Sequence, residues 1–479
     1  MAIEHGSFFI GGKLVPPASS KRFTLVSAFT EESIGSAPEA VEADVDRAVA
    51  AARYAFDETG WASCPPAERA AAMVRFADAL ERRSAELARL VSVQNGMPIN
   101  LSEAFEGGFA IGMLRYYASL AAALETEDTR PSQLGLKTLV NHSPIGVVAA
   151  IVPWNYPVVL AMSKIAPALA AGCTLVVKAS PNTILDSYVL AEAAIEAELP
   201  AGVINWVAAD RAVSAYLVSH PGIDKVAFTG STAAGRSIAS ACASLLRPVT
   251  LELGGKSAAI ILDDADLNTI TPGLQFITYM NNGQTCVSCS RVLAPARRYN
   301  EVVDALVAQA SSLKLGDPLD RATEIGPMAT SEHRGKIETY IARGKLEARL
   351  VAGGGRPRDL DRGWFVEPTV FADVNNSAAI AQEEIFGPVL AVIPYKDDAD
   401  AVRIANDSAY GLGGTVWSAD PERAMNIARR VQTGTIGVNG YAIAIGSPFG
   451  GVKASGLGRE FSPESLASYQ QLKSIYVSH

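Results

Sequence analysis

The sequence is poor in cysteine and histidine, with five of each among 479 residues. Five cysteines do not make a disulfide framework in so long a chain, which favours a reducing compartment. Two of them, Cys286 and Cys289, form a C-x-x-C pattern. A structural zinc site needs four cysteine or histidine ligands, and neither a second C-x-x-C nor a close histidine pair occurs. We therefore expect no metal, and keep a thioredoxin-like redox pair as an alternative.

The sequence also lacks an excess of basic residues and long apolar runs. Its 41 basic and 50 acidic residues give a net charge of -9, without a basic stripe that would follow the phosphates of a nucleic acid. No run of about 18 apolar residues could cross a membrane, and the N-terminus does not resemble a signal peptide. We expect a cytoplasmic protein with neither a nucleic-acid nor a membrane partner.

The length and the hydrophobic pattern predict an α/β protein of two or three domains. Short apolar runs alternate with helical stretches between Cys173 and Gly255, which is typical of a parallel sheet covered on both faces. A second region of mixed helices and strands follows, with strands expected over 414–417 and 434–438. Upstream, Phe8–Val15 reads as a hairpin, and residues 44–56 and 66–93 read as two helices. Ligands of such parallel sheets bind beyond the carboxyl ends of the strands.

Two apolar segments near residues 136–140 and 474–477 read as strands. Together they could extend a sheet across a subunit boundary. Ordinary edge strands explain the same pattern equally well.

Cys286 lies between a predicted helix and a strand that begins at Arg291. A thiol at such a junction can be exposed in a cleft as a nucleophile, although an isolated cysteine is more often a small buried side chain. Other polar residues at predicted strand ends favour the first interpretation. Glu252 follows an apolar strand, where a carboxylate has a raised pKa and suits a general base, or is a paired structural residue.

Three further segments are candidates for ligand contacts. Lys178 ends an apolar strand and could meet ribose hydroxyls, although a solvated lysine fits the pattern as well. The turn Phe228–Gly235 joins a strand to a helix whose N-terminus favours an anion, or is simply a capped helix. Asn155 lies in a proline-flanked turn and could donate to an oxyanion.

Taken together, these segments resemble the aldehyde dehydrogenase superfamily over essentially the whole chain. The motifs that carry the resemblance are Pro153–Pro157, Phe228–Thr232, Leu251–Lys256, Gly283–Cys286, Glu383–Pro388 and Ser447–Gly451. This set in this order is highly specific. The interval of 34 residues from Glu252 to Cys286 (286 − 252) is also similar to that of the family.

The resemblance implies an NAD(P)-dependent, hydrolytic aldehyde dehydrogenase. It implies a Rossmann-like cofactor domain (1–121 and 145–254), an α/β catalytic domain (255–454) and a small β oligomerisation arm (122–144 and 455–479) of a homodimer or homotetramer. By the resemblance Cys286 is the nucleophile and Glu252 the general base. Asn155 and the backbone amide of Cys286 then bind the oxyanion.

The resemblance also implies the cofactor and substrate contacts. Lys178 would contact the adenosine ribose, Ser231 a phosphate, Glu384 the nicotinamide ribose and Phe386 the nicotinamide. Trp154, Gly230 and Gly254 complete the expected cofactor site. The residues expected to line the aldehyde tunnel are Tyr156, Val159, Leu160, Met280, Thr285, Val287, 441–445 and Phe449. These walls are apolar and carry no Arg or Lys for a distal carboxylate, so they favour a hydrophobic aldehyde.

The sequence departs from the family pattern at two positions. Pro181 stands where many NAD-preferring relatives have a Glu, so we expect NAD and keep NADP open. Cys289 stands at a position that is often a small residue, and it is either packed in the core or a redox partner of Cys286. A thiol redox or sensing protein that uses both cysteines is therefore the alternative function.

Overall fold

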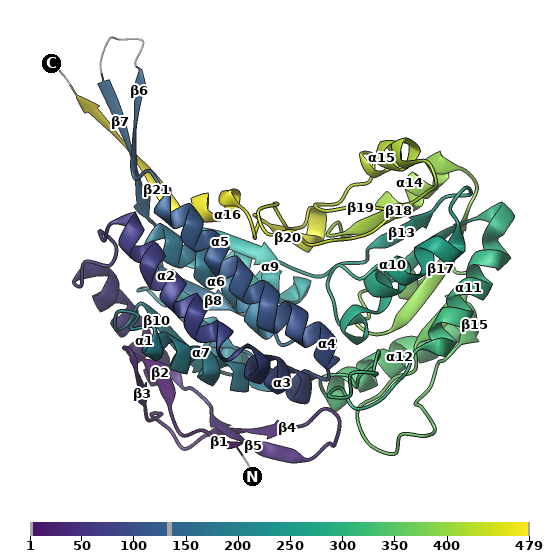
Figure 1. Ribbon diagram of the computed structural model, residues 1–479, viewed down its shortest axis with the longest axis horizontal. Coiled ribbons are helices and arrows are strands. Elements are labelled where there is room, and N and C mark those ends of the chain that lie inside the picture. Colours follow the sequence, from purple (N-terminus) through teal and green to yellow (C-terminus); the bar gives the residue numbers. More distant parts are fainter. Residues whose placement is uncertain (1–2, 132–136, 478–479) are drawn as a thin grey trace.

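The computed structural model describes residues 3–131 and 137–477, which form two α/β blocks and a projecting three-stranded sheet (Figure 1). The mixed α/β class expected from the sequence is confirmed. Within the described residues, no helix has the length and apolarity needed to cross a membrane.

The first block is built on an eight-stranded sheet. In spatial order its strands are β20 (Gly456–Leu457), β12 (Val249–Glu252), β11 (Lys225–Thr229), β8 (Val147–Ile151), β9 (Thr174–Ala179), β10 (Ile204–Ala208), β2 (Phe8–Ile10) and β3 (Lys13–Val15). The five strands from β12 to β10 run parallel and are almost entirely buried, because helices cover both faces. One face carries α1 (Glu42–Asp57), α8 (Arg211–Ser219) and α9 (Thr232–Ser244), and the other carries α6 (Pro157–Ala171) and α7 (Leu185–Glu196).

The strand order places a switch point beside β8. The chain leaves β8 and returns as its neighbour β9 on one side, whereas β11 pairs with β8 on the other side. The turns that follow β8 and β11 therefore face each other at the carboxyl edge of the sheet. Ligands of open α/β sheets bind at such a crevice.

The second block contains a seven-stranded sheet. Its strands in spatial order are β15 (Arg349–Ala352), β16 (Thr369–Ala372), β17 (Val389–Tyr395), β14 (Arg291–Pro295), β13 (Ala258–Ile261), β18 (Gly414–Trp417) and β19 (Gly437–Val438). Its main helices are α10 (Leu267–Tyr279), α11 (Tyr299–Ser312), α12 (Ser331–Glu347), α14 (Asp398–Asn406) and α15 (Pro421–Ala428). Cys286 lies between α10 and β14, so it faces the first block from the amino end of this sheet.

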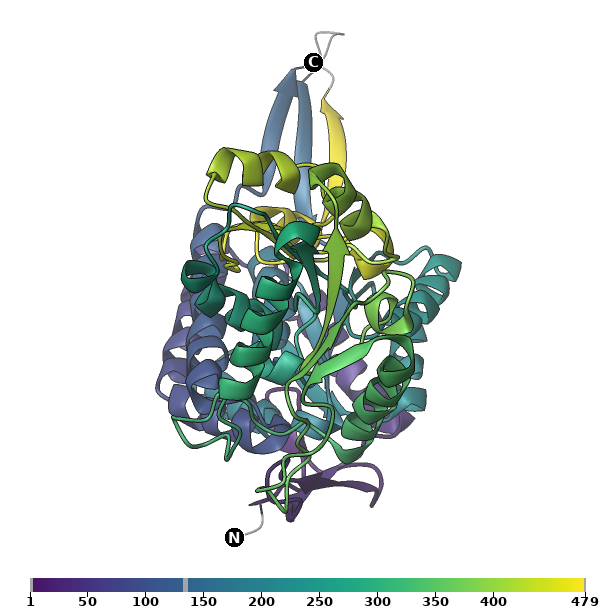
Figure 2. The same ribbon diagram turned by 90° about the vertical axis from the view of Figure 1, so that its right-hand side faces the viewer.

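A sheet of β21 (Gln470–Val477), β7 (Lys137–Pro144) and β6 (Glu127–Pro131) projects from the first block (Figures 1 and 2). Strands β21 and β7 pair antiparallel from Gln470 with Pro144 to Val477 with Lys137. The two segments predicted as strands are thus neighbours, although Leu136 lies outside the described residues. A smaller sheet of β1 (Ile3–Glu4), β5 (Ser33–Pro38) and β4 (Arg22–Val26) lies near the N-terminus.

Two predicted elements were wrong in extent. The single helix expected over 66–93 is two helices, α2 (Pro66–Glu81) and α3 (Ser84–Asn95), because α2 packs on α5 (Ala110–Ala122) whereas α3 packs on α4 (Ile99–Ser102) and the π-helical turn η1 (Glu103–Phe109). Arg82 at the break donates to Glu196 at 2.9 Å. The strand expected over 434–438 is reduced to β19, since only Gly437 and Val438 pair with β18.

Candidate active site

A cleft of about 230 Å³ opens at the switch point of the first sheet. We call it the switch-point cleft. Its walls come from the turns after β8 and β11, the segment after β12, the loop of Cys286, and two segments of the second block. They are formed by Pro153, Trp154, Asn155, Thr229, Gly230, Ser231, Leu253, Gly254, Cys286, His333, Lys336, Glu384 and Phe386. Eight residues predicted for catalysis or cofactor binding thus meet in one cleft.

The loop that presents Cys286 is held under backbone strain. Asn281 and Asn282 both have positive φ angles, 50° and 61°, which side-chain-bearing residues seldom adopt. The amide of Asn282 donates to Gly96 O at 2.9 Å and accepts from Gly326 N at 2.7 Å, and Gln284 Oε1 accepts from Ala329 N at 2.9 Å. These bonds fix the loop before the cysteine, and Ser288 Oγ, which donates to Thr278 O at 2.8 Å, fixes it after the cysteine. The thiol is therefore presented by a rigid turn.

Cys286 is partly exposed in the cleft, but protein atoms surround most of its side chain. Burial raises the pKa of the thiol well above its usual range, and the negative charges of Glu384 and Glu252 raise it further. The thiol is therefore protonated at neutral pH in the isolated chain. A base must accept its proton before the sulfur can attack an electrophile.

Asn155 is buried beside this loop and its backbone is clamped from two sides. Its carbonyl accepts from Asn281 Nδ2 at 2.9 Å and from Asn95 Nδ2 at 3.2 Å. Its own Nδ2 donates one hydrogen to Gln284 O at 3.1 Å. An amide nitrogen carries two hydrogens, so the second is available to an oxygen in the cleft. The geometry suits an oxyanion donor.

Glu252 ends β12 and is buried, with 3% of its surface exposed. It does not line the switch-point cleft, but its negative charge raises the pKa of Cys286. Among the described residues, neither carboxylate oxygen has a hydrogen-bond partner. Burial raises its pKa well above the usual range, and the neighbouring Glu460 raises it further, while Lys164 opposes the shift. A buried carboxylate left without partners is available to accept a proton.

Behind Glu252 lies a buried ion pair that the sequence did not reveal. Lys164 on α6 is fully buried and donates to Glu460 Oε1 at 2.9 Å and to Thr229 Oγ1 at 2.7 Å. Glu460 is separated from Lys164 by 296 residues, so no local pattern connects them. The charges of Lys164 and Glu460 act in opposite directions on the pKa of the predicted base, Glu252.

Two glycines bring the remaining parts of the cleft together. A Cβ atom on Gly254 would lie 2.4 Å from Glu384 Oε2, and one on Gly255 would lie 2.3 Å from Cys286 O. Because neither glycine has a Cβ atom, the segments can approach closely, and Gly255 N donates to Glu384 Oε1 at 2.9 Å. The predicted residue Gly254 therefore makes room for the predicted ribose contact Glu384.

The opposite wall is aromatic. The rings of Trp154 and Phe386 meet edge to face with centroids 5.5 Å apart. His333, on α12, packs against both rings at 5.2 and 5.9 Å, and Lys336 lies one turn further on. His333 and Lys336 were not predicted, because a histidine or lysine on a polar helix usually marks a solvated face.

The expected phosphate and adenosine contacts are more widely spaced. Ser231 caps α9, a helix of 13 residues, through a bond from Ala234 N at 3.3 Å, and Gly230 lies directly before it. A Cβ on Gly230 would lie 2.5 Å from the ring of Phe228. Lys178 ends β9 and is partly buried, which lowers its pKa to about 8, but it does not line the switch-point cleft.

The predicted substrate residues do not line the switch-point cleft, and they pack around the loop of Cys286. Tyr156 Oη and Thr285 Oγ1 are 2.9 Å apart, and Thr285 Oγ1 donates to Met280 O at 2.9 Å. The apolar members belong to one buried cluster, namely Tyr156, Val159, Leu160, Met280, Val287 and Phe449. Three rings that were not predicted join them: Phe105 lies 5.8 Å from Tyr156, Phe461 lies 4.9 Å from Phe449, and Phe109 lies 5.9 Å from Phe461.

Cys289 is fully buried, and its sulfur lies 3.7 Å from Thr415 Oγ1. Burial raises the pKa of this thiol to about 12. The side chain packs as a small apolar residue would, in agreement with the first of the two interpretations considered above.

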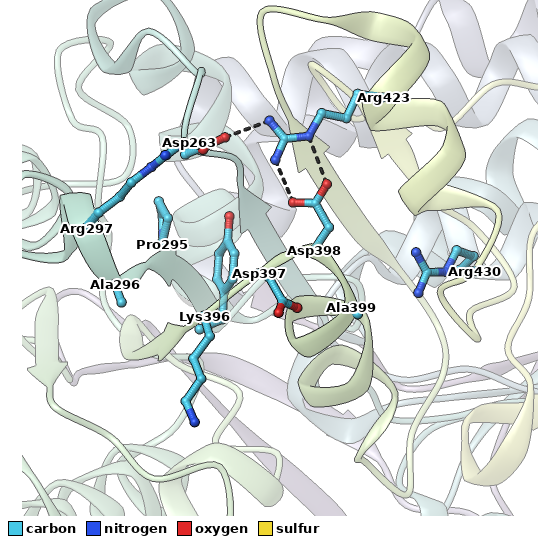
Figure 3. A pocket seen from close by; sticks show the side chains of 11 residues that line it. Asp263, Pro295, Ala296, Arg297, Lys396, Asp397, Asp398, Ala399, Arg423 and Arg430 are labelled. Carbon is cyan, nitrogen blue, oxygen red and sulfur yellow. Dashed lines mark hydrogen bonds and ion pairs between the residues drawn. The ribbon is translucent and has the colours of Figure 1, made fainter.

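A larger hollow of about 800 Å³ lies at the carboxyl end of the second sheet. We call it the outer hollow. Charged side chains line it, and the acidic groups at its centre are paired (Figure 3): Arg423 donates to Asp398 at 2.6 and 2.9 Å and to Asp263 at 2.6 Å. It contains no cysteine, serine or histidine among its lining residues. The switch-point cleft is therefore the better candidate for chemistry.

Comparisons with known proteins identify the family of the chain. The aldehyde dehydrogenase family matches residues 14–475. The chain is 59% identical to the geranial dehydrogenase of Castellaniella defragrans over the full length of both. It is 46% identical to a Mycobacterium tuberculosis aldehyde dehydrogenase solved with NAD+, at a TM-score of 0.97 over 100% of this chain and 99% of the other. It is 37% identical to an aldehyde dehydrogenase C mutant of Pseudomonas syringae solved with NAD+ and octanal, at a TM-score of 0.94 over 98% and 96%. The chain belongs to the aldehyde dehydrogenase family.

Proposed function

We propose that this enzyme oxidises a hydrophobic aldehyde to the carboxylic acid with NAD+, through a thioester on Cys286. The observation that carries the proposal is the meeting of three groups at one place. A nucleophilic sulfur and an amide with a second hydrogen line the same cleft. The charge of a buried carboxylate, which has no hydrogen-bond partner among the described residues, reaches that sulfur and raises its pKa.

The lining of the cleft suits the nicotinamide and phosphate parts of a dinucleotide. Ser231 at the N-terminus of α9 would hold a phosphate, Glu384 would accept from the nicotinamide ribose, and Phe386 would pack beside the nicotinamide. Lys178 would contact the adenosine ribose at the end of β9. When bound, NAD+ supplies a hydride acceptor and a positive charge near Cys286. NAD+ is preferred because the M. tuberculosis relative was solved with it, and NADP+ stays open because Pro181 offers no carboxylate to repel a 2′-phosphate.

Each step uses a group described above. The proton of Cys286 passes to solvent water, and the sulfur forms a bond to the aldehyde carbon while the carbonyl electrons move to oxygen. Asn155 Nδ2 and the backbone amide of Cys286 donate to that oxyanion. Hydride then leaves the carbon and a thioester remains. Glu252 takes a proton from water, the hydroxide oxygen bonds to the acyl carbon, and the carbon–sulfur bond breaks to release the acid. The sum is aldehyde, water and NAD+ giving acid, NADH and a proton.

The substrate is proposed from the walls beside Cys286 and from the relatives. The cluster around Tyr156, Phe105 and Phe449 is apolar and aromatic, which suits an aldehyde with an extended hydrocarbon tail. One relative is named a geranial dehydrogenase and another was solved with octanal. We place a terpenoid or medium-chain aldehyde first.

The domain and subunit assignments follow the same proposal. Residues 1–121 with 145–254 bind the cofactor, 255–454 carry the nucleophile, and 122–144 with 455–479 form an arm. Strand β21 exposes Leu472 and Tyr476 (63% and 72% exposed) and has a free edge among the described strands, which suits pairing with a second copy in a homodimer or homotetramer. We propose a cytoplasmic location from the five free cysteines.

The test is formation of NADH, measured as absorbance with geranial, octanal and benzaldehyde and with each cofactor. We expect NADH with the first two aldehydes. No NADH with any aldehyde at any pH between 6 and 10 would refute the proposal.

A further inference from the structure

His333 makes a hydrogen bond that the proposed chemistry does not use. Its Nε2 lies 2.7 Å from the backbone oxygen of Phe386. A carbonyl oxygen only accepts, so Nε2 carries the proton and donates. Burial lowers the pKa of the imidazole to about 4, and the bond to Phe386 opposes that shift without reversing it. The ring is therefore neutral, with a fixed tautomer.

The residue that accepts this bond has an unusual backbone. Phe386 has a φ of 62°, in the left-handed region that side-chain-bearing residues avoid. The next residue, Gly387, would place a Cβ 2.5 Å from Ile337 on the helix of His333, and Gly283 would place one 2.3 Å from the backbone of Gly387. The segment is thus pressed between α12 and the loop of Cys286. An unfavourable backbone held in this way needs support from its neighbours.

His333 supplies that support from a fixed position. It is the third residue of α12, and its backbone N–H donates to the capping side chain of Thr330 at 3.1 Å. Its ring packs edge-on against Phe386 at 5.9 Å and against Trp154 at 5.2 Å. The backbone oxygen of Trp154 accepts from Asn95 Nδ2 at 3.0 Å. Three rings from three separate segments therefore brace one another in the wall of the switch-point cleft.

We propose that His333 is a positioning residue: its N–H holds the strained backbone of Phe386, so that the Phe386 ring forms the wall against which a flat nicotinamide ring packs. The proposal rests on the proposed function, because it assigns that part of the cleft to the nicotinamide. Without the N–H, the backbone of Phe386 relaxes and its ring leaves the wall. The adenosine and phosphate end of the cofactor would lie at Lys178 and Ser231, the contacts proposed above, and not at this wall.

The test is equilibrium binding to the full-length enzyme without aldehyde, so it does not depend on turnover. His333→Phe keeps a ring but loses the donor, whereas His333→Gln keeps an N–H donor. NADH affinity, followed by fluorescence titration, is expected to fall about 5- to 10-fold in His333→Phe, the size of one lost hydrogen bond. His333→Gln is expected to stay within about threefold of the wild type. ADP-ribose, which lacks the nicotinamide, is expected to bind both variants as it binds the wild type.

Equal losses for NADH and ADP-ribose would overturn the assignment, since they would indicate general damage to the fold. Unchanged NADH binding by His333→Phe would overturn it as well. If the wild type bound neither ligand, the proposed function would fail, which is a different result from a loss confined to His333→Phe.

A second variant tests the link to Phe386. Phe386→Gly removes the ring and the backbone strain, so it is expected to weaken NADH binding by a similar factor. Adding His333→Phe to it should then cause no further loss. Additive losses would contradict the role of His333 in holding Phe386.

Discussion

The two parallel sheets each end in a hollow at their carboxyl edge, and the two hollows differ in how their charges are satisfied. The outer hollow is larger, at about 800 against about 230 Å³, but its Arg423 is bound to Asp398 and Asp263. At the switch-point cleft, burial raises the pKa of Cys286, and the nearby Glu252 has no hydrogen-bond partner among the described residues. Paired surface charges contribute little, whereas unpaired buried groups are costly and persist where chemistry needs them. The candidate active site is therefore identified by buried ionisable groups without partners, and not by the volume of the hollow.

The largest expected effect comes from the nucleophile. Cys286→Ala should lower kcat/KM for geranial by at least about 10⁴-fold, because no sulfur remains to form the thioester. The matched control is Cys289→Ala, three residues away and fully buried, which should retain kcat/KM within about twofold even if it is slightly less stable. An equal loss of kcat/KM in both variants would contradict the assignment of Cys286 as the sole nucleophile.

The next effect concerns the oxyanion. Asn155→Ala should lower kcat by about 10²- to 10³-fold with a smaller change in KM, because the amide acts on charge that develops during the reaction. Asn426→Ala is the control, since this asparagine is exposed on α15 and its loss should leave kcat unchanged. A variant that raises KM alone would assign Asn155 to ground-state binding.

A third prediction concerns the charged residues that set the pKa of Glu252. Glu252 works deprotonated and its pKa is raised, so kcat/KM should fall as the pH falls through that raised pKa. Glu460→Gln removes a neighbouring negative charge and releases the positive charge of Lys164, and both changes lower the pKa of Glu252. The acid limb of the pH profile should therefore move to lower pH. Glu464→Gln, an exposed carboxylate nearby, should not move it, and a shift of the limb to higher pH in Glu460→Gln would contradict the account.

The smallest effect is expected in the outer hollow. Arg423→Met should leave kcat/KM within about twofold and lower the free energy of unfolding by only about 1 kcal/mol, since its ion pairs are half-exposed. Thermal unfolding and steady-state kinetics measure both quantities. A large loss of activity would show that the second hollow also takes part in function.

Most of the first sheet could be predicted from the sequence, because its strands are continuous apolar runs between helices. The break between α2 and α3 could not, since the helical periodicity continues through Arg82 and Arg83 and only packing on different partners separates the two helices. The motif residues around Cys286 were predicted together by resemblance. His333, Lys164 and Glu460 were not, because each acts through a residue far away in the chain, and a local pattern carries no sign of such contacts.

The central claim is that an acyl group forms on Cys286 and leaves with the help of Glu252. The most direct measurement is peptide mass spectrometry of Glu252→Gln after mixing with geranial and NAD+. Because hydrolysis is slowed, the peptide that contains Cys286 should carry one acyl group, and this adduct should be far less abundant in the wild type. The claim would be contradicted if NADH formed without an adduct, or if the acyl group were found on Cys289.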